Sequence, residues 1–471
     1  MLPPTAPTTS KGDPSCPYSK NQVLTLRVER LSSDGSGVAH SPDGETVFIP
    51  GAAPGDEARV RIVKDCKRYA FGILDEVLTP SPDRIPVDCA VAGPCGGCSL
   101  RHLDYAAELR AKQENVADAF ARIGGLDVPV LPIVGSPEVN RYRNKVQFPV
   151  GVDKSGKPCI GFYAGRTHRI VPCPDCRLQP GVLNEIGNAL CAFFAEKGIQ
   201  PYSEETGRGL VRHIFLRRGA HSGQIMVCLV CTRAKLPSAE ELCTRLKAQF
   251  AEITTILLNV NAKNTNVILG TETHTLYGPG YIEDTLCGVP VQLGPLSFYQ
   301  VNTLAAEQLY GIAAQYAQLT PDDLLLDLYC GMGTIGLSMA AHCRELIGVE
   351  IVPEAIESAK ANAARMGADV AAKSRFFCAD AGQAATRLAA EGLHPDIVML
   401  DPPRKGCDEA TLSAVVRMSP RRVVYVSCNP ATAARDAAWL EQNGYHAEKV
   451  QPVDLFPRTR HCECVLSLSK V

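Results

Sequence analysis

The sequence predicts a multidomain α/β protein whose C-terminal part, residues 296–471, is a doubly wound, Rossmann-like domain. Three observations predict this fold. Strand-like and helix-like segments alternate after residue 296, a glycine-rich turn follows the first of these strands, and acidic residues stand where later strands end. Strands that alternate with helices build a parallel sheet, and such sheets bind ligands at the carboxyl ends of their strands.

The N-terminal part of the chain predicts a tail and a small barrel. Residues 1–19 are rich in Pro, Thr and Ser without an apolar stretch, which indicates a disordered tail and not a signal peptide. Residues 20–79 contain short strand-like runs separated by turn signals, which is typical of a small OB-like β-barrel. Five basic residues lie toward the end of this segment: Arg59, Arg61, Lys64, Lys67 and Arg68.

The middle of the chain, residues 80–295, is expected to form a central α+β region with a cysteine cluster. It opens with a stretch rich in Pro, Gly and Cys, followed by a helical pattern over residues 103–123 that stops at two glycines. This helix is a candidate to pack on the catalytic domain. The remaining residues mix strands and helices without a clear parallel repeat.

Composition limits the classes of function. The 471 residues carry a formal net charge of −2, so any nucleic-acid surface must be local. No apolar run approaches the length of a membrane span, and we expect no membrane association. Twenty cysteines without a signal peptide indicate a reducing, cytoplasmic compartment, where clustered cysteines are metal or catalytic sites.

The glycine-rich turn indicates a nucleotide-type cofactor. Gly331, Gly333 and Gly336 match G-x-G-x-x-G between a strand at residues 324–328 and a helix. Glu350 ends the next strand, where a carboxylate can bind both ribose hydroxyls. This much suits NAD as well as S-adenosylmethionine, and an NAD-dependent oxidoreductase is one hypothesis.

Two later motifs favour S-adenosylmethionine. Asp401 ends a strand and precedes Pro-Pro-Arg, and Cys428 ends another strand and precedes Asn-Pro. Both are expected at the same sheet edge as Gly331. An NAD enzyme has no particular need for either. Most free cysteines are small buried residues, but the position of Cys428 at a strand end favours reactivity.

The cysteine cluster indicates a metal centre. Cys89, Cys95 and Cys98 lie within ten residues, and Cys176 is the best candidate for a fourth ligand. Thiolates at this spacing suit an iron–sulfur cluster or zinc.

The chain resembles the RNA uracil-5-methyltransferase family from about residue 20 to its C-terminus. The resemblance rests on five motifs in the family order, at residues 298–302, 327–336, 401–406, 427–436 and 454–463. It implies that Cys428 is the nucleophile and Glu463 the general base. It also implies a cofactor site for S-adenosylmethionine, which with the glycine-rich turn comprises Gln300, Tyr329, Gly331, Gly333, Glu350, Asp380 and Asp401.

The resemblance also implies a substrate and a metal centre. Residues 20–79 are similar to the TRAM domain of RNA-modifying enzymes, and rRNA-modifying members of the family carry a 4Fe–4S cluster, for which Cys176 fits the ligand position better than Cys173 does. These features point to 23S rRNA as the partner of a monomeric enzyme, with tRNA as the alternative substrate. The basic segments around Arg141–Lys145 and Arg212–Arg218 resemble family segments near the RNA.

Overall fold

The computed structural model describes residues 18–19, 21–165 and 167–471, so most of the tail predicted for residues 1–19 lies outside the described residues. Contacts divide the chain into two units. The first contains residues 1–88, 97–115 and 458–460, and the second contains the rest. None of the helices in the described ranges is long and apolar enough to cross a membrane.

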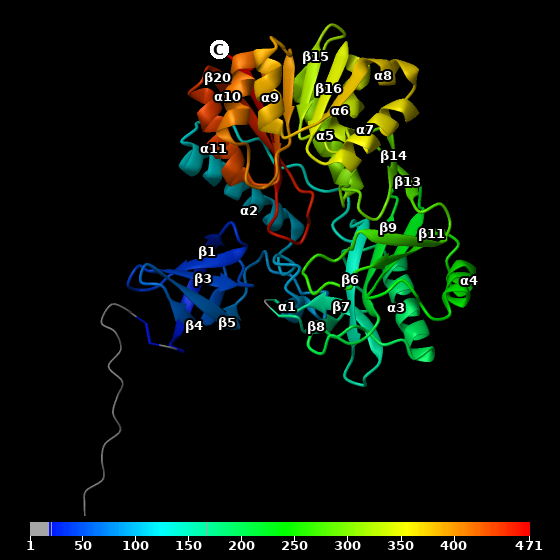
Figure 1. The fold of residues 1–471 in the computed structure, drawn as a ribbon. Coiled ribbons are helices and arrows are strands. Elements are labelled where there is room, and N and C mark those ends of the chain that lie inside the picture. Colours follow the sequence, from blue (N-terminus) through cyan, green and yellow to red (C-terminus); the bar gives the residue numbers. More distant parts are fainter. Residues whose placement is uncertain (1–17, 20, 166) are drawn as a thin grey trace, which may run out of the picture. The chain divides into compact units, whose positions relative to one another are not determined.

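The first unit is built around a closed five-stranded barrel of strand order β1-β2-β3-β5-β4 (Figure 1). Alternate side chains such as Val28, Val47 and Val60 point inward, as the period of a strand requires. Gly72 is required at a close approach, because a Cβ there would lie 2.2 Å from the Val60 side chain. The expectation of a small barrel is therefore confirmed; its strands are β1 Val23–Leu31, β2 Ser36–His40, β3 Thr46–Pro50, β4 Glu57–Asp65 and β5 Tyr69–Thr79.

A helical stretch follows the barrel. Its elements are α1 (Ala92–Cys95), α2 (Tyr105–Asp118) and a π-helical turn, η1 (Ala119–Gly124). The side chains of Val116 and Phe120 pack into the core of the C-terminal sheet.

The central part of the second unit is a seven-stranded mixed sheet of order β12-β11-β10-β9-β6-β7-β8. Only β10 and β11 run parallel within it. Leu183, Ile186 and Leu190 form the apolar stripe of α3 and pack on the sheet, as a helical period predicts. The elements of this region, including a separate hairpin of β13 and β14, are β6 Lys145–Val152, β7 Pro158–Tyr163, β8 Ile170–Pro172, α3 Gly181–Glu196, β9 Val211–Arg218, β10 Ile225–Cys231, α4 Ala239–Gln249, β11 Ile253–Val260, β12 Glu272–Tyr277, β13 Ile282–Leu286 and β14 Val289–Leu293.

The C-terminal part is a second seven-stranded sheet of order β17-β16-β15-β18-β19-β21-β20. Strands β15 to β19 are parallel, whereas β21 pairs antiparallel with β19 and β20. The elements are α5 Thr303–Ala317, β15 Leu324–Leu328, α6 Thr334–Met339, η2 Ala340–His342, β16 Glu345–Glu350, α7 Pro353–Arg365, α8 Ala368–Lys373, β17 Ser374–Cys378, α9 Ala381–Ala390, β18 Ile397–Leu400, α10 Glu409–Met418, β19 Arg422–Ser427, α11 Pro430–Glu441, β20 Tyr445–Val453 and β21 Glu463–Lys470.

Helices cover both faces of this sheet, with α5–α7 on one side and α9–α11 on the other (Figure 1). Along β15, Leu325 faces the first layer while Leu326 and Leu328 face the second. The doubly wound sheet predicted from the alternation of strands and helices is confirmed, and its carboxyl edge carries the candidate site.

Candidate active site

Cys428 and Glu463 lie side by side at one end of two antiparallel strands. Cys428 directly follows β19, and Glu463 begins β21. Ser427 pairs with Cys464 across these strands, so Cys428 and Glu463 stand at the next step of the same register. The fold thus brings together two residues that the sequence separates by a strand, a helix and a loop.

The side chains at this edge are electrostatically coupled. Burial raises the pKa of Cys428 to about 11, with further upward contributions from Glu463 and Asp401 and an opposing one from Arg404. Burial likewise raises the pKa of Glu463 to about 8, again with Asp401 adding to the shift and Arg404 opposing it. Burial alone raises the pKa of Asp401 to about 7. At neutral pH the thiol therefore keeps its proton, and the pKa values of the two carboxyl groups lie close to neutrality.

Helix α11 holds the loop that carries Asp401 and Arg404. Asn429 caps α11 and its Nδ2 donates to the Arg404 carbonyl at 3.0 Å. Arg435 Nη2 donates to the Lys405 carbonyl at 3.0 Å. The first two turns of α11 therefore fix the loop after Asp401.

The next residue of α11 fixes the end of that loop. Asp436 is 1% exposed, and its Oδ2 accepts hydrogen bonds from the backbone N–H of Cys407 at 2.8 Å and the Tyr425 hydroxyl at 2.6 Å. Gly406 has φ 79°, and a Cβ there would lie 2.6 Å from the Asp436 carboxylate. In the sequence Arg435 and Asp436 are recognisable only as motif residues, whereas in the fold they position this loop.

The glycines of the turn after β15 serve different purposes. Gly331 has φ 56°, and no described atom lies within 4 Å of the Cβ position, so a ligand can approach its backbone. Its backbone N–H donates to Glu350 Oε2 at 3.1 Å. A Cβ on Gly333 would instead lie 3.1 Å from Leu337 and 3.3 Å from Phe376, so Gly333 permits close helix–sheet packing.

The predicted cofactor residues Glu350, Asp380 and Tyr329 lie at the carboxyl ends of β16, β17 and β15. Glu350 Oε1 also accepts from the backbone N–H groups that follow it, at 2.9 and 3.0 Å. The Asp380 carboxylate caps α9 by accepting from the Gln383 N–H at 3.1 Å. Tyr329 adopts φ 67°, and its hydroxyl lies 3.4 Å from Thr411 Oγ1.

Gln300 reaches the same edge from another direction. Its backbone carbonyl accepts from Asn144 Nδ2 at 2.8 Å. Its side chain hydrogen-bonds to Tyr310, a fully buried residue whose pKa is raised by burial and then by the Asp401 charge. Gln300 therefore contacts a buried tyrosine that lies within the electrostatic influence of Asp401.

Asp327 belongs to this site although sequence analysis assigned it no role. It is 1% exposed, and its Oδ2 accepts from the Gly336 N–H at 3.0 Å. Oδ1 has no hydrogen-bond partner among the described residues. Burial raises the pKa of Asp327 to about 8, and the charges of Asp401 and Glu350 add to the shift. An acid inside the apolar run Leu-Leu-Leu-Asp-Leu was the available signal, because buried acids are rare without a partner.

The surplus of negative charge defines what the edge can bind. The charges of Asp401 and Glu350 act on Asp327, and the charge of Asp401 acts on Glu463 and Cys428, where Arg404 opposes it. A ligand that carries positive charge, such as a sulfonium, fits this carboxylate-rich site.

Three of the predicted metal ligands lie in the second unit with Cys173. The Cys173 thiol hydrogen-bonds to Cys176 and lies within electrostatic reach of Cys89 and Cys95, which together with burial raises its pKa. Cys98 belongs to the first unit. Among the described residues, no group of three or more Cys, His, Asp or Glu is arranged to hold a single metal ion.

The loop around Cys176 is fixed by side chains from outside it. Arg141 binds Asp175 through two hydrogen bonds of 2.7 and 2.9 Å, and its Nη1 donates to the Cys176 carbonyl at 2.8 Å. Asn184 Nδ2 donates to the same carbonyl at 3.0 Å. Arg141, expected among basic groups near RNA, therefore has an internal structural role.

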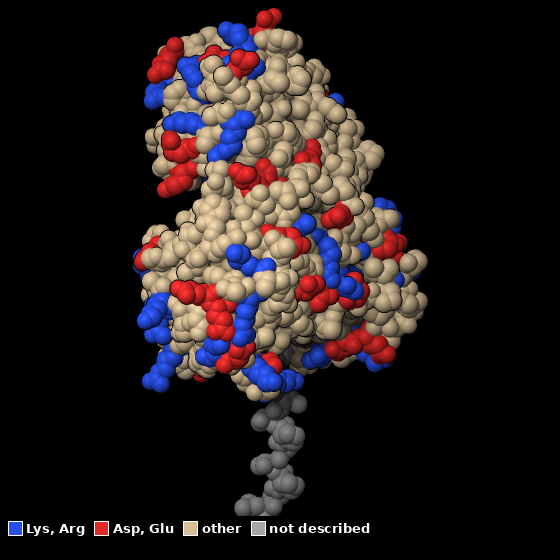
Figure 2. Space-filling view, turned by 90° about the vertical axis from the view of Figure 1, so that its right-hand side faces the viewer, with Lys and Arg blue, Asp and Glu red and all other residues tan. Residues whose placement is uncertain are grey.

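Basic side chains expected near RNA differ in their accessibility. The Arg212 guanidinium is buried and pairs with Glu204 at 2.9 Å, and burial followed by the Arg212 charge lowers the pKa of His213 to about 4. On the face drawn in Figure 2, acidic side chains lie among the basic ones, and this face offers no continuous basic surface over the residues described.

The barrel gathers its aromatic residues at one place. The rings of Phe48, Tyr69 and Phe71 lie with centroids 5.7 Å apart in each pair. In the same barrel, Arg59 and Arg61 are paired with Glu76 and Asp75, each at 2.9 Å. Three exposed cations have no ion-pair partner among the described residues: Lys64, Lys67 and Arg68.

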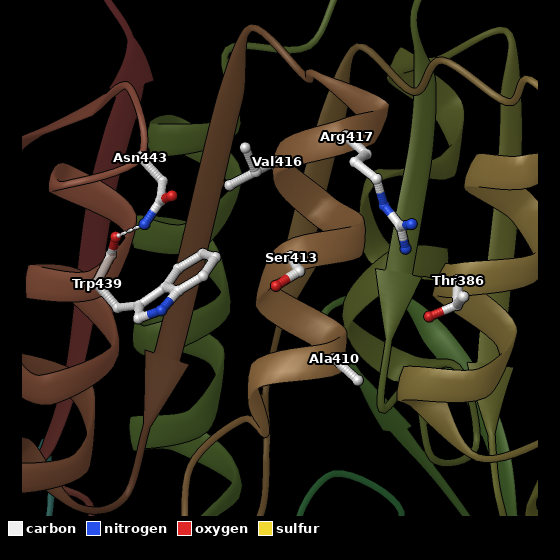
Figure 3. A pocket seen from close by; sticks show the side chains of 7 residues that line it. All are labelled: Thr386, Ala410, Ser413, Val416, Arg417, Trp439 and Asn443. Carbon is white, nitrogen blue, oxygen red and sulfur yellow. Dashed lines mark hydrogen bonds between the residues drawn. The ribbon is translucent and has the colours of Figure 1, made fainter.

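A separate hollow of about 350 Å³ lies on the outer surface of α9, α10 and α11 (Figure 3). It is lined by Trp439, the one tryptophan of the chain, together with polar residues such as Arg417 and Asn443. It shares no lining residue with the strand-end site. Its tryptophan is a convenient fluorescent reporter of the fold around α11.

The chain is similar in sequence to known RNA methyltransferases. The sequence model described as tRNA (Uracil-5-)-methyltransferase matches residues 221–471, and the TRAM domain model matches residues 19–74. An uncharacterized RNA methyltransferase of Halalkalibacterium halodurans is 43% identical over 96% of this chain and 98% of its own length. One of Oceanobacillus iheyensis is 41% identical over 96% and 98%.

A solved structure also matches nearly the whole chain. The tRNA (uracil-54, C5)-methyltransferase of Pyrococcus abyssi, in complex with S-adenosyl-L-homocysteine, superimposes with a TM-score of 0.76 and 26% identity. The match covers 94% of this chain and 100% of that one.

Proposed function

The chain belongs to the tRNA (uracil-5-)-methyltransferase family, and from this premise we propose that it methylates C5 of a specific uridine in RNA. The observation that carries the proposal is the adjacency of Cys428 and Glu463 beside Asp401 at the carboxyl edge of the sheet. C5 methylation of uracil requires one nucleophile and one base, and this edge offers both. The NAD-dependent alternative has no use for either residue.

Cys428 would act first. C5 of uracil is a poor nucleophile, and addition of the Cys428 thiolate to C6 turns the ring into an enolate that can attack an electrophile. S-adenosylmethionine supplies that electrophile as a methyl group on a sulfonium. Because the pKa of Cys428 is about 11, the thiolate forms readily only after the surrounding negative charge is reduced. A cationic ligand beside Asp401 and Glu463 would have this effect.

Glu463 would complete the reaction. After the methyl group has joined C5, that carbon still carries a proton, and the Glu463 carboxylate would remove it. Elimination then restores the C5=C6 double bond and frees Cys428. A pKa of about 8 suits this task, because a base is most effective when its pKa lies near the working pH.

The cofactor would lie along the carboxyl edge of β15 to β18. Glu350 and the accessible backbone of Gly331 would bind the ribose of the cofactor. The remainder of the cofactor would be surrounded by Gln300, Tyr329, Asp380 and Asp401. The excess of carboxylates supports a cationic cofactor.

We propose a 4Fe–4S cluster on Cys89, Cys95, Cys98 and Cys176. In such a cluster each cysteine binds a different iron, so the thiols need not converge on one point as they must around a single zinc ion. The electrostatic interaction of Cys89 and Cys95 with Cys173, whose thiol hydrogen-bonds to Cys176, supports a shared metal centre among these cysteines. Its expected role is to order the loop region near the RNA.

We propose 23S rRNA as the substrate, with tRNA as the second candidate because the structurally similar archaeal enzyme acts on tRNA. The exposed ring of Tyr69, its half-buried neighbours Phe48 and Phe71, and the exposed cations Lys64, Lys67 and Arg68 would contact single-stranded RNA through stacking and charge.

Incubation with methyl-labelled cofactor and each purified RNA, followed by mass mapping of 5-methyluridine, tests the proposal. Label in 23S rRNA supports the first substrate, and label in tRNA alone supports the second. Absence of 5-methyluridine from both RNAs would contradict the function.

A further inference from the structure

Three cations lie together beside the loop that leads to Gln300, and none of them has a carboxylate partner within the part of the chain that the structure describes. Lys145 begins β6 and stands opposite Arg217 of β9 in the strand register. Arg143 and Arg217 are the two charged groups that act on the Lys145 ammonium. No described carboxylate forms an ion pair or hydrogen bond with any of the three.

Arg217 is held rigidly without being neutralised. It is 1% exposed, and its Nη1 and Nη2 donate to the Gly294 and Ser297 carbonyls at 2.9 and 2.7 Å. Both acceptors are uncharged. Its Nε is buried and has no partner among the described residues. The full positive charge of Arg217 therefore remains beside Lys145.

Elsewhere this chain pairs its buried cations with carboxylates. Lys112 is 1% exposed and binds Glu108 at 2.7 Å, and Arg84 likewise pairs with the buried Asp56. Pairing is the usual requirement, because an unpaired charge away from water is costly. At Lys145, burial and the two guanidinium groups instead lower the pKa to about 8. The uncompensated positive charge around Lys145 therefore favours binding of an anion from outside the chain.

The neighbouring loop suits a nucleic acid. Leu296 and Phe298 are 66% and 75% exposed, and they lie in the segment that Arg217 anchors. Asn144, next to Lys145, donates to the backbone carbonyl of Gln300. Cations and an exposed aromatic ring beside the predicted reaction site are typical of a surface that follows an RNA strand.

We propose that Arg143, Lys145 and Arg217 form a binding site for a backbone phosphate of the RNA next to the target uridine. This inference rests on the proposed function, because it takes RNA as the substrate. Lys145 would bind the phosphate directly, and Arg217 would hold the loop and strengthen the local field. The carboxylate of the cofactor shares the same chemistry and is the competing source of the anion.

The test compares Lys145→Gln, Lys145→Arg and the control Lys154→Gln, which removes an exposed lysine at the β6–β7 turn. The affinity of each variant for an oligouridylate is measured over a range of KCl concentrations. Its affinity for S-adenosylhomocysteine is measured by calorimetry. Its folding is checked by Trp439 emission and by the melting temperature. We expect Lys145→Gln to weaken RNA binding about tenfold, as for one charged hydrogen bond. The slope of log affinity against log salt should fall by about 0.7, the value for one phosphate contact on a single strand.

The other variants sharpen the outcome. Lys145→Arg should keep the wild-type slope, and Lys154→Gln should change neither quantity. The melting temperature of Lys145→Gln should stay level or rise, because the substitution removes a partly buried charge that is repelled by Arg217. Loss of S-adenosylhomocysteine affinity with an unchanged RNA slope would assign the anion to the cofactor and overturn the proposal. An unchanged slope and unchanged cofactor affinity would also overturn it. A wild-type chain that binds no RNA would overturn the proposed function as well.

Discussion

Replacing Glu463 by Gln separates the two chemical roles at the sheet edge. Gln is isosteric with Glu but accepts no proton at neutral pH, so the C5 proton stays and Cys428 cannot leave. Loss of a general base costs roughly 10²–10⁴ in rate. We expect turnover to fall by this factor and a covalent protein–RNA adduct to accumulate, carrying the label of a methyl-labelled cofactor.

The same substitution should make Cys428 more reactive toward a small reagent. The pKa of Cys428 lies about two units above its ordinary value of 9.0, so about a hundredfold less thiolate is present at a given pH below 9. Burial accounts for the largest share and the Glu463 charge for the next. Removing that charge should therefore raise the alkylation rate less than tenfold. The increase should be present at pH 9 and absent at pH 6, where Glu463 is already protonated.

Iodoacetamide labelling of Cys428, followed by mass spectrometry at the two pH values, measures this effect. Denaturing electrophoresis of the RNA reaction measures the adduct, which must vanish when Cys428→Ala is added. Glu441→Gln on α11 is the matched control, because this carboxylate bonds only to the exposed His446 in the described part of the chain. Wild-type turnover by Glu463→Gln without an adduct would refute the assignment of the base.

Three further predictions concern the same chain. Cys428→Ala should abolish methylation but leave S-adenosylhomocysteine affinity within about twofold in calorimetry, and normal turnover would exclude the covalent route. Protein purified without oxygen should be brown, with about four irons per chain. Triple replacement of Cys89, Cys95 and Cys98 should remove the colour. Colourless protein that contains stoichiometric zinc would instead favour a zinc site. Arg404→Gln should raise the pKa of Cys428 and of Glu463, because the Arg404 charge lowers both. Alkylation of Cys428 at pH 9 should then be slower, and the rising limb of kcat/KM should move above pH 8. An unshifted pH profile would contradict the electrostatic assignment.

The sequence alone determined features whose cause is local. The alternation of apolar runs and helical periods predicted strands and helices, and β15 has the predicted bounds, residues 324–328. The glycines of the turn at residues 331–336 and the acids at strand ends were visible because backbone conformation and strand ends leave local sequence signals. Five motifs in order were enough to indicate the family.

Only the tertiary structure decided which of these residues meet. Cys428 and Glu463 are neighbours because β21 inserts antiparallel between β19 and β20, and no local signal specifies that register. The same holds for Asp327, whose role depends on burial near Asp401 and Glu350.

The basic segment at residues 141–145 shows the difference most clearly. In sequence its charges are equivalent, but in the fold Arg141 pairs with Asp175, whereas Lys145 faces Arg217. Whether a charge is structural or available to a ligand depends on partners that are distant in sequence, because pairing and desolvation are set by packing and not by the order of residues.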